Sequence, residues 1–172
     1  IAVIGPTGTG KSALALELAQ KTGGVVINTD SMQVYRDLPI LTAQPDVAEQ
    51  ARVPHRLYGF LGLDDACDAQ RWAELAAGEI GAALAAGRLP IVVGGTGLYI
   101  RALMTGFSPM PDISARARDG ARQMVAELGA AEMHRRLTER DGVTAARVNP
   151  GDRQRIARAW EVLEETGQPR AR

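Results

Sequence analysis

The chain has 172 residues, of which 45% are hydrophobic and 23% are charged, values typical of a globular domain with a real core. The formal net charge is zero, so no overall basic field indicates a nucleic-acid partner. The single cysteine excludes a disulfide framework and a thiolate metal cluster. We see no membrane-spanning stretch of about 18 apolar residues and no signal-peptide pattern. We therefore expect a cytoplasmic enzyme without a membrane partner.

The charge is unevenly distributed along the chain. Residues 101–172 carry 13 Arg, no Lys and 10 acidic residues, a net charge of +3, whereas residues 1–100 carry −3. Arginine without lysine suits bidentate contacts to phosphate and carboxylate groups. Solvated helix faces explain most of these arginines equally well.

The first twelve residues predict a phosphate site. Residues 1–4 form an apolar run typical of a buried parallel strand, and residues 13–19 are strong helix formers. Between them lies a full match to the pattern G-x-x-x-x-G-K-[ST], formed by Gly5, Pro6, Thr7, Gly8, Thr9, Gly10, Lys11 and Ser12. Backbone N–H groups and a helix N-terminus favour an anion there, Lys11 adds a mobile positive charge, and Ser12 offers a hydroxyl ligand for Mg²⁺. The pattern does not say which phosphorylated ligand binds.

The next elements predict an α/β fold. Residues 25–28 are expected to form a second buried strand, joined to the first by a right-handed parallel crossover. A short helix over 46–51 and a longer helix over 68–86 precede a third buried strand over 89–93. A further helix is expected over 98–103. This alternation predicts a P-loop NTPase-like parallel sheet flanked by helices, with a helical insertion.

The last third of the chain reads as helical. Residues 114–147 follow a break rich in Gly and Pro and have an apolar face formed by Met124, Val125, Leu128, Met133 and Leu137. A final helix is expected over 153–166, with Asn149 as its N-cap. We therefore divide the chain into a P-loop core (1–105), a helical insertion (106–148) and a helix that returns to the core (149–172).

Asp30 is the second candidate site residue. It follows the second strand at the carboxyl edge of the sheet, where ligands bind in open α/β folds. A carboxylate there can hold a proton-bearing nucleophile or hydrated Mg²⁺. The spacing of Asp30 and Gln33 equally predicts a helix cap, and an amide beside a carboxylate also suits contact with a base edge.

The Gly-Gly-Thr-Gly stretch at residues 94–97 is the third candidate. It favours close approach to a ligand, with a tight turn or close backbone packing as alternatives. No apolar run ends in the Asp of a Walker B element, which argues against a nucleotide-hydrolysing motor.

Two arginines near the end of the chain form the fourth candidate. Arg155 and Arg158 share one face of the expected last helix. They could clamp a diphosphate or a nucleic-acid backbone, or they could pair with Asp152 and Glu161 on an exposed face, where such pairs contribute little.

Five stretches, taken in order, resemble the tRNA dimethylallyltransferase (isopentenyltransferase) family, and the resemblance covers nearly the whole chain. They are residues 5–12, 30–35, 42–45, 90–100 and 149–162. The family pattern usually has Lys where Gln44 stands and His where Arg56 stands. Members are markedly longer and contain a later Lys-Arg-Gln-x-Thr-Trp run that is absent here, so we expect a fragment or a truncated product.

The resemblance implies transfer of a dimethylallyl group from its diphosphate to N6 of adenine-37 in a tRNA, with Mg²⁺. It implies catalytic roles for Thr7, Lys11 and Asp30, and diphosphate binding by residues 5–12. It implies tRNA contacts from Asp30, Ser31, Met32, Gln33, Thr96, Arg118, Gln154, Arg155, Ile156, Ala157 and Arg158. Residues 106–148 would grip the anticodon arm as a lid, and we expect a monomer. A P-loop kinase that phosphorylates a small molecule with ATP, using Asp30 as base, is the alternative.

Overall fold

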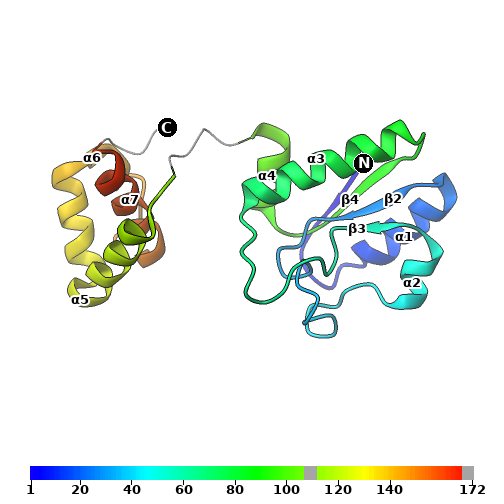
Figure 1. Ribbon diagram of the computed structural model, residues 1–172, viewed down its shortest axis with the longest axis horizontal. Coiled ribbons are helices and arrows are strands. Elements are labelled where there is room, and N and C mark those ends of the chain that lie inside the picture. The colour runs from blue at the N-terminus through cyan, green and yellow to red at the C-terminus, as the bar shows by residue number, and fades with distance from the viewer. Residues whose placement is uncertain (107–111, 168–172) are drawn as a thin grey trace. The chain divides into compact units, whose positions relative to one another are not determined.

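The computed structural model describes residues 1–106 and 112–167. The chain forms two compact units, Ile1–Phe107 and Ser108–Arg172, each with its own apolar core (Figure 1).

The first unit is built on a four-stranded parallel sheet. Its strands are β1 (Ala2–Ile4), β2 (Val25–Asn28), β3 (His55–Arg56) and β4 (Pro90–Gly94), in the order β1-β4-β2-β3. The two central strands, β2 and β4, are buried at every residue, as expected for apolar runs covered on both faces. Because β4 lies between β1 and β2, the loop that follows β1 and the loop that follows β2 leave the sheet on opposite sides of the end of β4.

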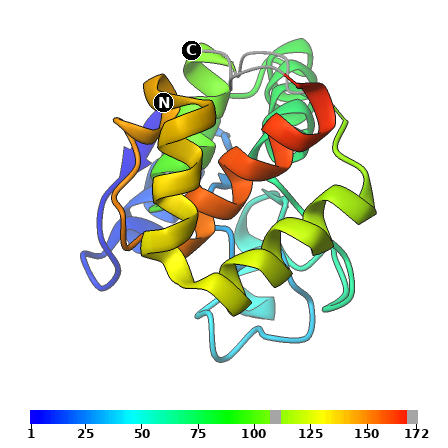
Figure 2. The same cartoon turned by 90° about the vertical axis from the view of Figure 1, so that its left-hand side faces the viewer.

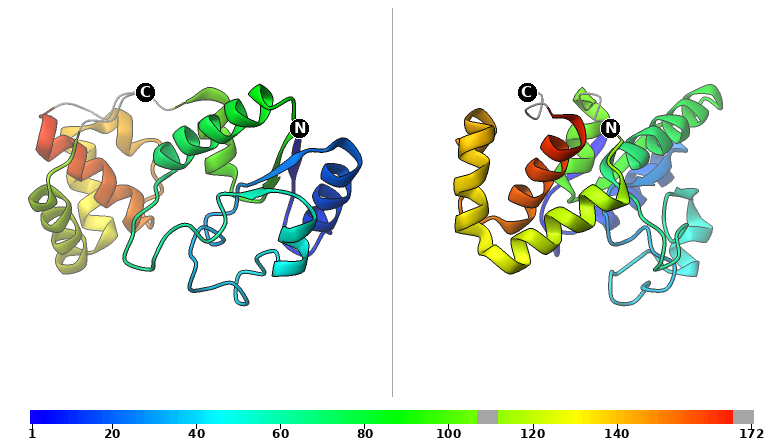
Figure 3. Two further views of the ribbon diagram at one scale, coloured as in Figure 1. Left: turned by 45° about the vertical axis from the view of Figure 1, so that its right-hand side comes forward. Right: turned by 60° about the vertical axis from the view of Figure 1, so that its left-hand side comes forward.

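Four helices belong to this unit: α1 (Lys11–Thr22), α2 (Val47–Arg52), α3 (Ala69–Ala85) and α4 (Gly97–Thr105). The core of α1 packs with Val26 and Ile91 of the sheet, whereas α3 packs through Ala83 with Ile27 and Val92. Successive strand residues point to opposite faces, so α1 and α3 cover opposite faces of the sheet (Figure 3). The predicted P-loop-type parallel sheet flanked by helices is confirmed.

Strand β3 was not predicted. It has two residues, His55 and Arg56, which pair in parallel with Val26 and Ile27. A segment this short shows no hydrophobic period of its own, and its place beside β2 is set by tertiary packing.

The second unit contains α5 (Ala115–Arg140), α6 (Gly142–Ala145) and α7 (Arg153–Thr166). Helix α5 bends at Gly129, which has φ 79° and ψ 161°. The stretch expected to be helical, 114–147, therefore consists of the two halves of α5 followed by α6. Helices α5 and α7 lie side by side (Figure 2). Their buried residues form one core, made by Ala121, Val125, Met133, Leu137, Ile156, Ala157, Ala159, Trp160 and Leu163.

The last helix, α7, packs with the helix of the expected insertion. Because the apolar side of α7 packs with that of α5, α7 belongs to the same unit as the expected insertion. The return of residues 149–172 to the α/β core stays a prediction.

The N-cap of α7 is Asp152 rather than Asn149, since Asp152 Oδ1 accepts from the Arg155 N–H at 3.0 Å. Asn149 Oδ1 instead accepts from the Gly151 N–H at 2.8 Å.

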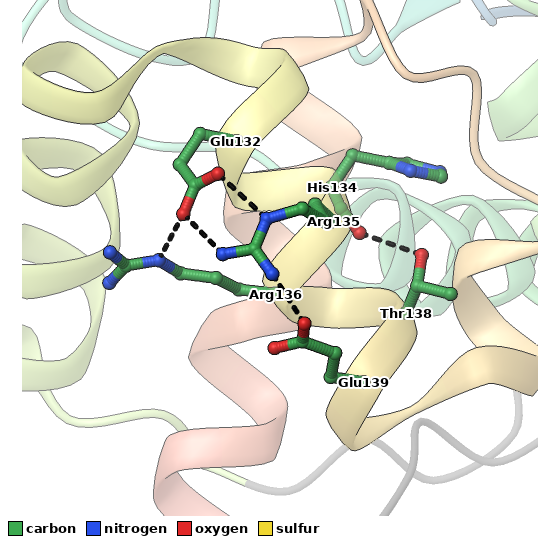
Figure 4. A network of polar contacts seen from close by, with 6 residues as sticks. All are labelled: Glu132, His134, Arg135, Arg136, Thr138 and Glu139. Carbon is green, nitrogen blue, oxygen red and sulfur yellow. Dashed lines mark hydrogen bonds and ion pairs between the residues drawn. The ribbon is translucent and has the colours of Figure 1, made fainter.

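Two arginines of α5, Arg135 and Arg136, pair with acidic residues of their own helix (Figure 4). The Glu132 carboxylate accepts hydrogen bonds from Arg135 and Arg136, both at 2.8 Å, and these bonds lower the pKa of Glu132 to about 2. Arg135 also pairs with Glu139. For these arginines the solvated-face interpretation is confirmed, and such exposed pairs contribute little to stability. In the described part of the chain, no helix is long and apolar enough to span a bilayer.

Candidate active site at the carboxyl edge of the sheet

The phosphate-loop motif connects β1 to α1, as predicted. Gly8 and Gly10 have φ values of 82° and 80°, a backbone conformation that L side chains rarely adopt. Gly10 is also the N-cap of α1, and no side chain caps this helix end. The first N–H groups of α1 therefore face the loop in the arrangement that binds anions.

The polar side chains of the loop lie close to its backbone. Lys11 Nζ and Thr9 Oγ1 both donate to the carbonyl oxygen of Pro6, the latter at 2.9 Å, so Lys11 lies across its own loop. Thr7 and Ser12 are exposed. The ammonium, the hydroxyls and the helix N-terminus together supply the donors that a diphosphate requires.

Asp30 is half-buried just beyond β2. Its Oδ1 accepts from the Met32 N–H at 2.9 Å, and the next helix begins only at Val47. The helix-cap interpretation of Asp30 is therefore wrong, because the carboxylate closes a local turn instead. Within the described residues Oδ2 has no hydrogen-bond partner, which leaves one carboxylate oxygen able to accept a proton.

Gln33 holds a neighbouring loop. Its Nε2 donates to the carbonyl oxygens of Thr42 and Ala43 at 2.8 and 3.0 Å, and Ala43 has a positive φ of 52°. This amide group is thus engaged within the protein. The expected contact of Gln33 with tRNA stays a prediction, as does that of Met32, whose side chain is 49% exposed.

The end of β4 links the phosphate loop to the Asp30 segment. The Gly5 N–H donates to the Gly94 carbonyl at 3.4 Å, and the Thr96 N–H donates to the Thr29 carbonyl at 3.2 Å. The Thr96 hydroxyl accepts from the Ser31 N–H at 2.9 Å and donates to Ser31 Oγ at 3.3 Å. Thr96 and Ser31, both expected to contact tRNA, therefore hold each other beside Asp30.

The glycine pair at the end of β4 serves close backbone packing. A Cβ on Gly94 would lie 2.6 Å from the carbonyl carbon of Thr29 and 2.9 Å from the Asp30 nitrogen, and one on Gly95 would lie 3.0 Å from the Gly5 oxygen. Of the interpretations considered for residues 94–97, close packing of backbones is the one that the contacts support. Gly94 is required because a side chain there would clash with neighbouring backbone, and not because a ligand must approach it, which was the favoured prediction.

The remaining candidates lie in the second unit. Arg118, Gln154 and Arg155 are exposed on its surface. The predicted tRNA contacts of Ile156 and Ala157 need correction, because their side chains are 0% and 8% exposed and belong to the core between α5 and α7. A period of three to four residues turns this side of α7 inward.

The two candidate arginines of α7 are paired, as the second interpretation suggested. Arg155 Nε lies 3.2 Å from Asp152 Oδ2, and Arg158 Nη1 donates to Glu161 Oε2 at 2.8 Å. The pairs are not equally exposed, since the Glu161 side chain is only 7% exposed. Arg158 is therefore anchored, whereas the Arg155 side chain, 72% exposed, lies at the surface.

A magnesium ion fits this site only together with a phosphorylated ligand. No group of three His, Cys, Asp or Glu side chains within residues 1–106 and 112–167 could hold a metal. Mg²⁺ commonly keeps several waters and binds through one or two protein oxygens plus substrate phosphates. The exposed Ser12 hydroxyl at the start of α1 is an oxygen donor suited to that mode.

Asn28 is the site residue that the sequence reasoning missed, because it was counted as the last residue of an apolar strand. It is 0% exposed. A buried amide two residues before a candidate catalytic carboxylate is a recognisable signal, since Asn side chains commonly bond to backbone two residues on.

The glycine contact generates a test. We expect Gly94→Ala to lower the free energy of unfolding of the first unit by about 1–3 kcal/mol, because the new methyl group must displace backbone. Gly97→Ala is the matched control, since its Cβ would meet nothing within 4 Å. Urea denaturation followed by Trp72 fluorescence in a Trp160→Phe background measures both. Equal stability of the two variants would contradict the packing role of Gly94.

Comparisons with known proteins match nearly the whole chain. A family model described as IPP transferase matches residues 33–172, and one described as isopentenyl transferase matches residues 1–60. The tRNA dimethylallyltransferase of Rhodospirillum rubrum is 52% identical over 97% of this chain and 51% of its own length. That of Granulibacter bethesdensis is 56% identical over 95% of this chain and 51% of its own length.

Solved structures give the same result. The full-length tRNA isopentenylpyrophosphate transferase of Bacillus halodurans is 34% identical with a TM-score of 0.61, covering 98% of this chain and 56% of its own. A eukaryotic dimethylallyltransferase acting on tRNA is 30% identical with a TM-score of 0.79, covering 98% and 42%. The chain thus spans about half the length of the relatives it matches.

Proposed function

Since the chain belongs to the IPP transferase family, we propose that the protein transfers a dimethylallyl group from dimethylallyl diphosphate to N6 of adenine-37 in a tRNA anticodon loop. The observation that carries this proposal is the joining of the phosphate loop and the Asp30 segment through the end of β4. These bonds bring a loop suited to a diphosphate and a carboxylate suited to accept a proton to one edge of the sheet. The relatives' names favour this reaction over the kinase alternative.

The phosphate loop would hold the diphosphate. Backbone N–H groups at the start of α1 and the Lys11 ammonium would bind its oxygens, and Thr7 would add a hydroxyl donor. Negative charge builds on the diphosphate as its bond to the allylic carbon breaks, so donors fixed in the loop stabilise the departing group more than the intact substrate. Mg²⁺, held through Ser12 and the diphosphate, would supply further positive charge.

Asp30 would handle the proton. The lone pair of the adenine N6 forms the new bond to the first carbon of the dimethylallyl group, while the carbon–oxygen bond to the diphosphate breaks. The N6 proton that must then be lost passes to the Asp30 carboxylate, whose Oδ2 is the oxygen without a partner among the described residues. Holding amine, carbon and carboxylate in one geometry removes much of the entropy cost of the reaction.

The tRNA would be bound by both units. The adenine must leave its stack to reach Asp30, at a cost of a few kcal/mol. Ser31, Met32, Gln33 and Thr96 are the proposed contacts near the base, and exposed Arg118, Gln154 and Arg155 would meet the anticodon arm. Arg158 would contribute from its anchored position beside Glu161. We also propose that the protein acts as a monomer in the cytoplasm, with residues 106–148 as the part that grips the tRNA.

Removing the proposed base tests the reaction. We expect Asp30→Ala to lower turnover by about 10²–10⁴-fold, because it removes the general base, while binding of the diphosphate persists. Transfer of a labelled dimethylallyl group to tRNA measures turnover. Asp64→Ala, which changes an exposed loop carboxylate, is the matched control and should leave turnover within about twofold. Near-normal turnover of Asp30→Ala would exclude its role as base.

Removing the loop ammonium tests diphosphate binding. We expect Lys11→Ala to weaken binding of inorganic pyrophosphate by about tenfold or more, since one charge-assisted contact is lost. Lys21→Ala removes an exposed lysine of the same helix that pairs with Glu17 and should not change affinity. Isothermal titration calorimetry measures both. Equal affinities of the two variants would argue that Lys11 does not contact the ligand.

A further inference from the structure

The last residue of β2 has its whole side chain engaged with the backbone around Asp30. Asn28 Oδ1 accepts from the Asp30 N–H at 2.8 Å, and Asn28 Nδ2 donates to the Asp30 carbonyl at 3.0 Å. One amide therefore binds both backbone polar groups of the proposed base. The orientation of the amide is settled by its partners, because an N–H requires the oxygen and a carbonyl requires the nitrogen.

The second N–H of this amide reaches another loop. Asn28 Nδ2 also donates to the Leu57 carbonyl at 3.0 Å, and Leu57 has a positive φ of 63°, a conformation uncommon for a residue with a side chain. The amide thus joins the Asp30 segment to the chain that follows β3. A residue with a side chain, such as Leu57, keeps a positive φ only when its surroundings impose it.

Asn28 is itself held rigidly. Its carbonyl oxygen accepts from Trp72 Nε1 of α3 at 3.0 Å, and Trp72 is 0% exposed. The Trp72 ring stacks on the Tyr99 ring of α4, with centroids 4.6 Å apart. Asn28 is therefore fixed by its contact with α3, and through Trp72 by α4, directly before the segment that carries Asp30.

The adjacent residue shows that burial alone does not explain the amide. Thr29 is also 0% exposed, yet its hydroxyl has no hydrogen-bond partner among the described residues. The polar atoms of the Asn28 amide thus have hydrogen-bond partners, whereas the hydroxyl of the neighbouring buried Thr29 has none among the described residues. Leaving a buried amide unsatisfied costs free energy, so the contacts of Asn28 constrain the Asp30 backbone.

We propose that Asn28 is a positioning residue for Asp30: its amide fixes the backbone from which the catalytic carboxylate projects. This inference rests on the proposed transferase function only in naming what Asp30 does. Asn28 holds the backbone of Asp30 and the Met32 N–H holds Oδ1 of its carboxylate, so the position of Oδ2 is constrained from both ends of the side chain. Small displacements of a catalytic group slow the reaction strongly, since a shift of about 1 Å can lower the rate about 10²-fold.

Kinetics of Asn28 variants test the inference. Asn28→Ala should lower kcat by about 10–100-fold with the KM for dimethylallyl diphosphate within about twofold, because the phosphate loop is not touched. Asn28→Ser should lose less, since a serine hydroxyl can still accept from an N–H two residues on. Thr29→Val is the matched control and should keep normal kcat, because that hydroxyl binds nothing in the described structure. Unchanged kcat in folded Asn28→Ala would overturn the proposal.

A second measurement does not depend on activity. Amide hydrogen exchange followed by NMR should show faster exchange of the Asp30 N–H in Asn28→Ala or Asn28→Ser, with the Val26 and Ile27 amides of β2 unchanged. Uniform acceleration across β2 would indicate a merely structural role and overturn the proposal. If Asn28→Ala does not fold, the serine variant decides. If the wild-type chain transfers no dimethylallyl group, the proposed function fails for this chain, and exchange at Asp30 still decides the role of Asn28.

Discussion

The backbone at the end of β4 is the constraint on which the candidate site depends. Residues 94–96 bond on one side to Gly5, the first residue of the phosphate loop, and on the other to Thr29 and Ser31 beside Asp30. Buried backbone groups must keep their partners, and the contact at Gly94 leaves no room for a side chain. Neither loop can move freely without loss of these bonds. The phosphate loop and the Asp30 segment therefore share one support.

The same strand order bears on the type of chemistry. The strand next to β1, β4, ends at Gly94 and is followed by Gly95, so no acidic residue stands at its end. P-loop motors hold Mg²⁺ with an acid from such a strand. Here that position is used for close contact between backbones, and the proposed proton acceptor, Asp30, follows the neighbouring strand β2. This arrangement suits a reaction in which the diphosphate is a leaving group.

The sequence predicted the elements with strong local signals and failed where distant contacts decide. Apolar runs and the glycine motif located β1, β2, β4 and α1. The expected burial of the first strand was wrong, since β1 is an edge strand and Ile1 and Ile4 are 58% and 50% exposed. Strand β3 has two residues and exists through its pairing with β2. The edge position of Asp30 was predicted, but its turn was not. Thr96 shapes this turn through a distant contact, whereas the contact of Asn28, two residues before Asp30, is a local signal that was missed. One sequence motif can also contain both exposed and core residues. Residues 154–158 were all expected to contact tRNA, yet two of their side chains are core.

The most direct test of the account is calorimetric titration of this chain with dimethylallyl diphosphate and, separately, with ATP, each with Mg²⁺. A phosphate loop adapted to an allylic diphosphate should bind dimethylallyl diphosphate clearly more tightly than ATP. Tighter binding of ATP would contradict the account and favour the kinase alternative. Binding of neither ligand would contradict the proposal that the phosphate loop of this chain holds a diphosphate.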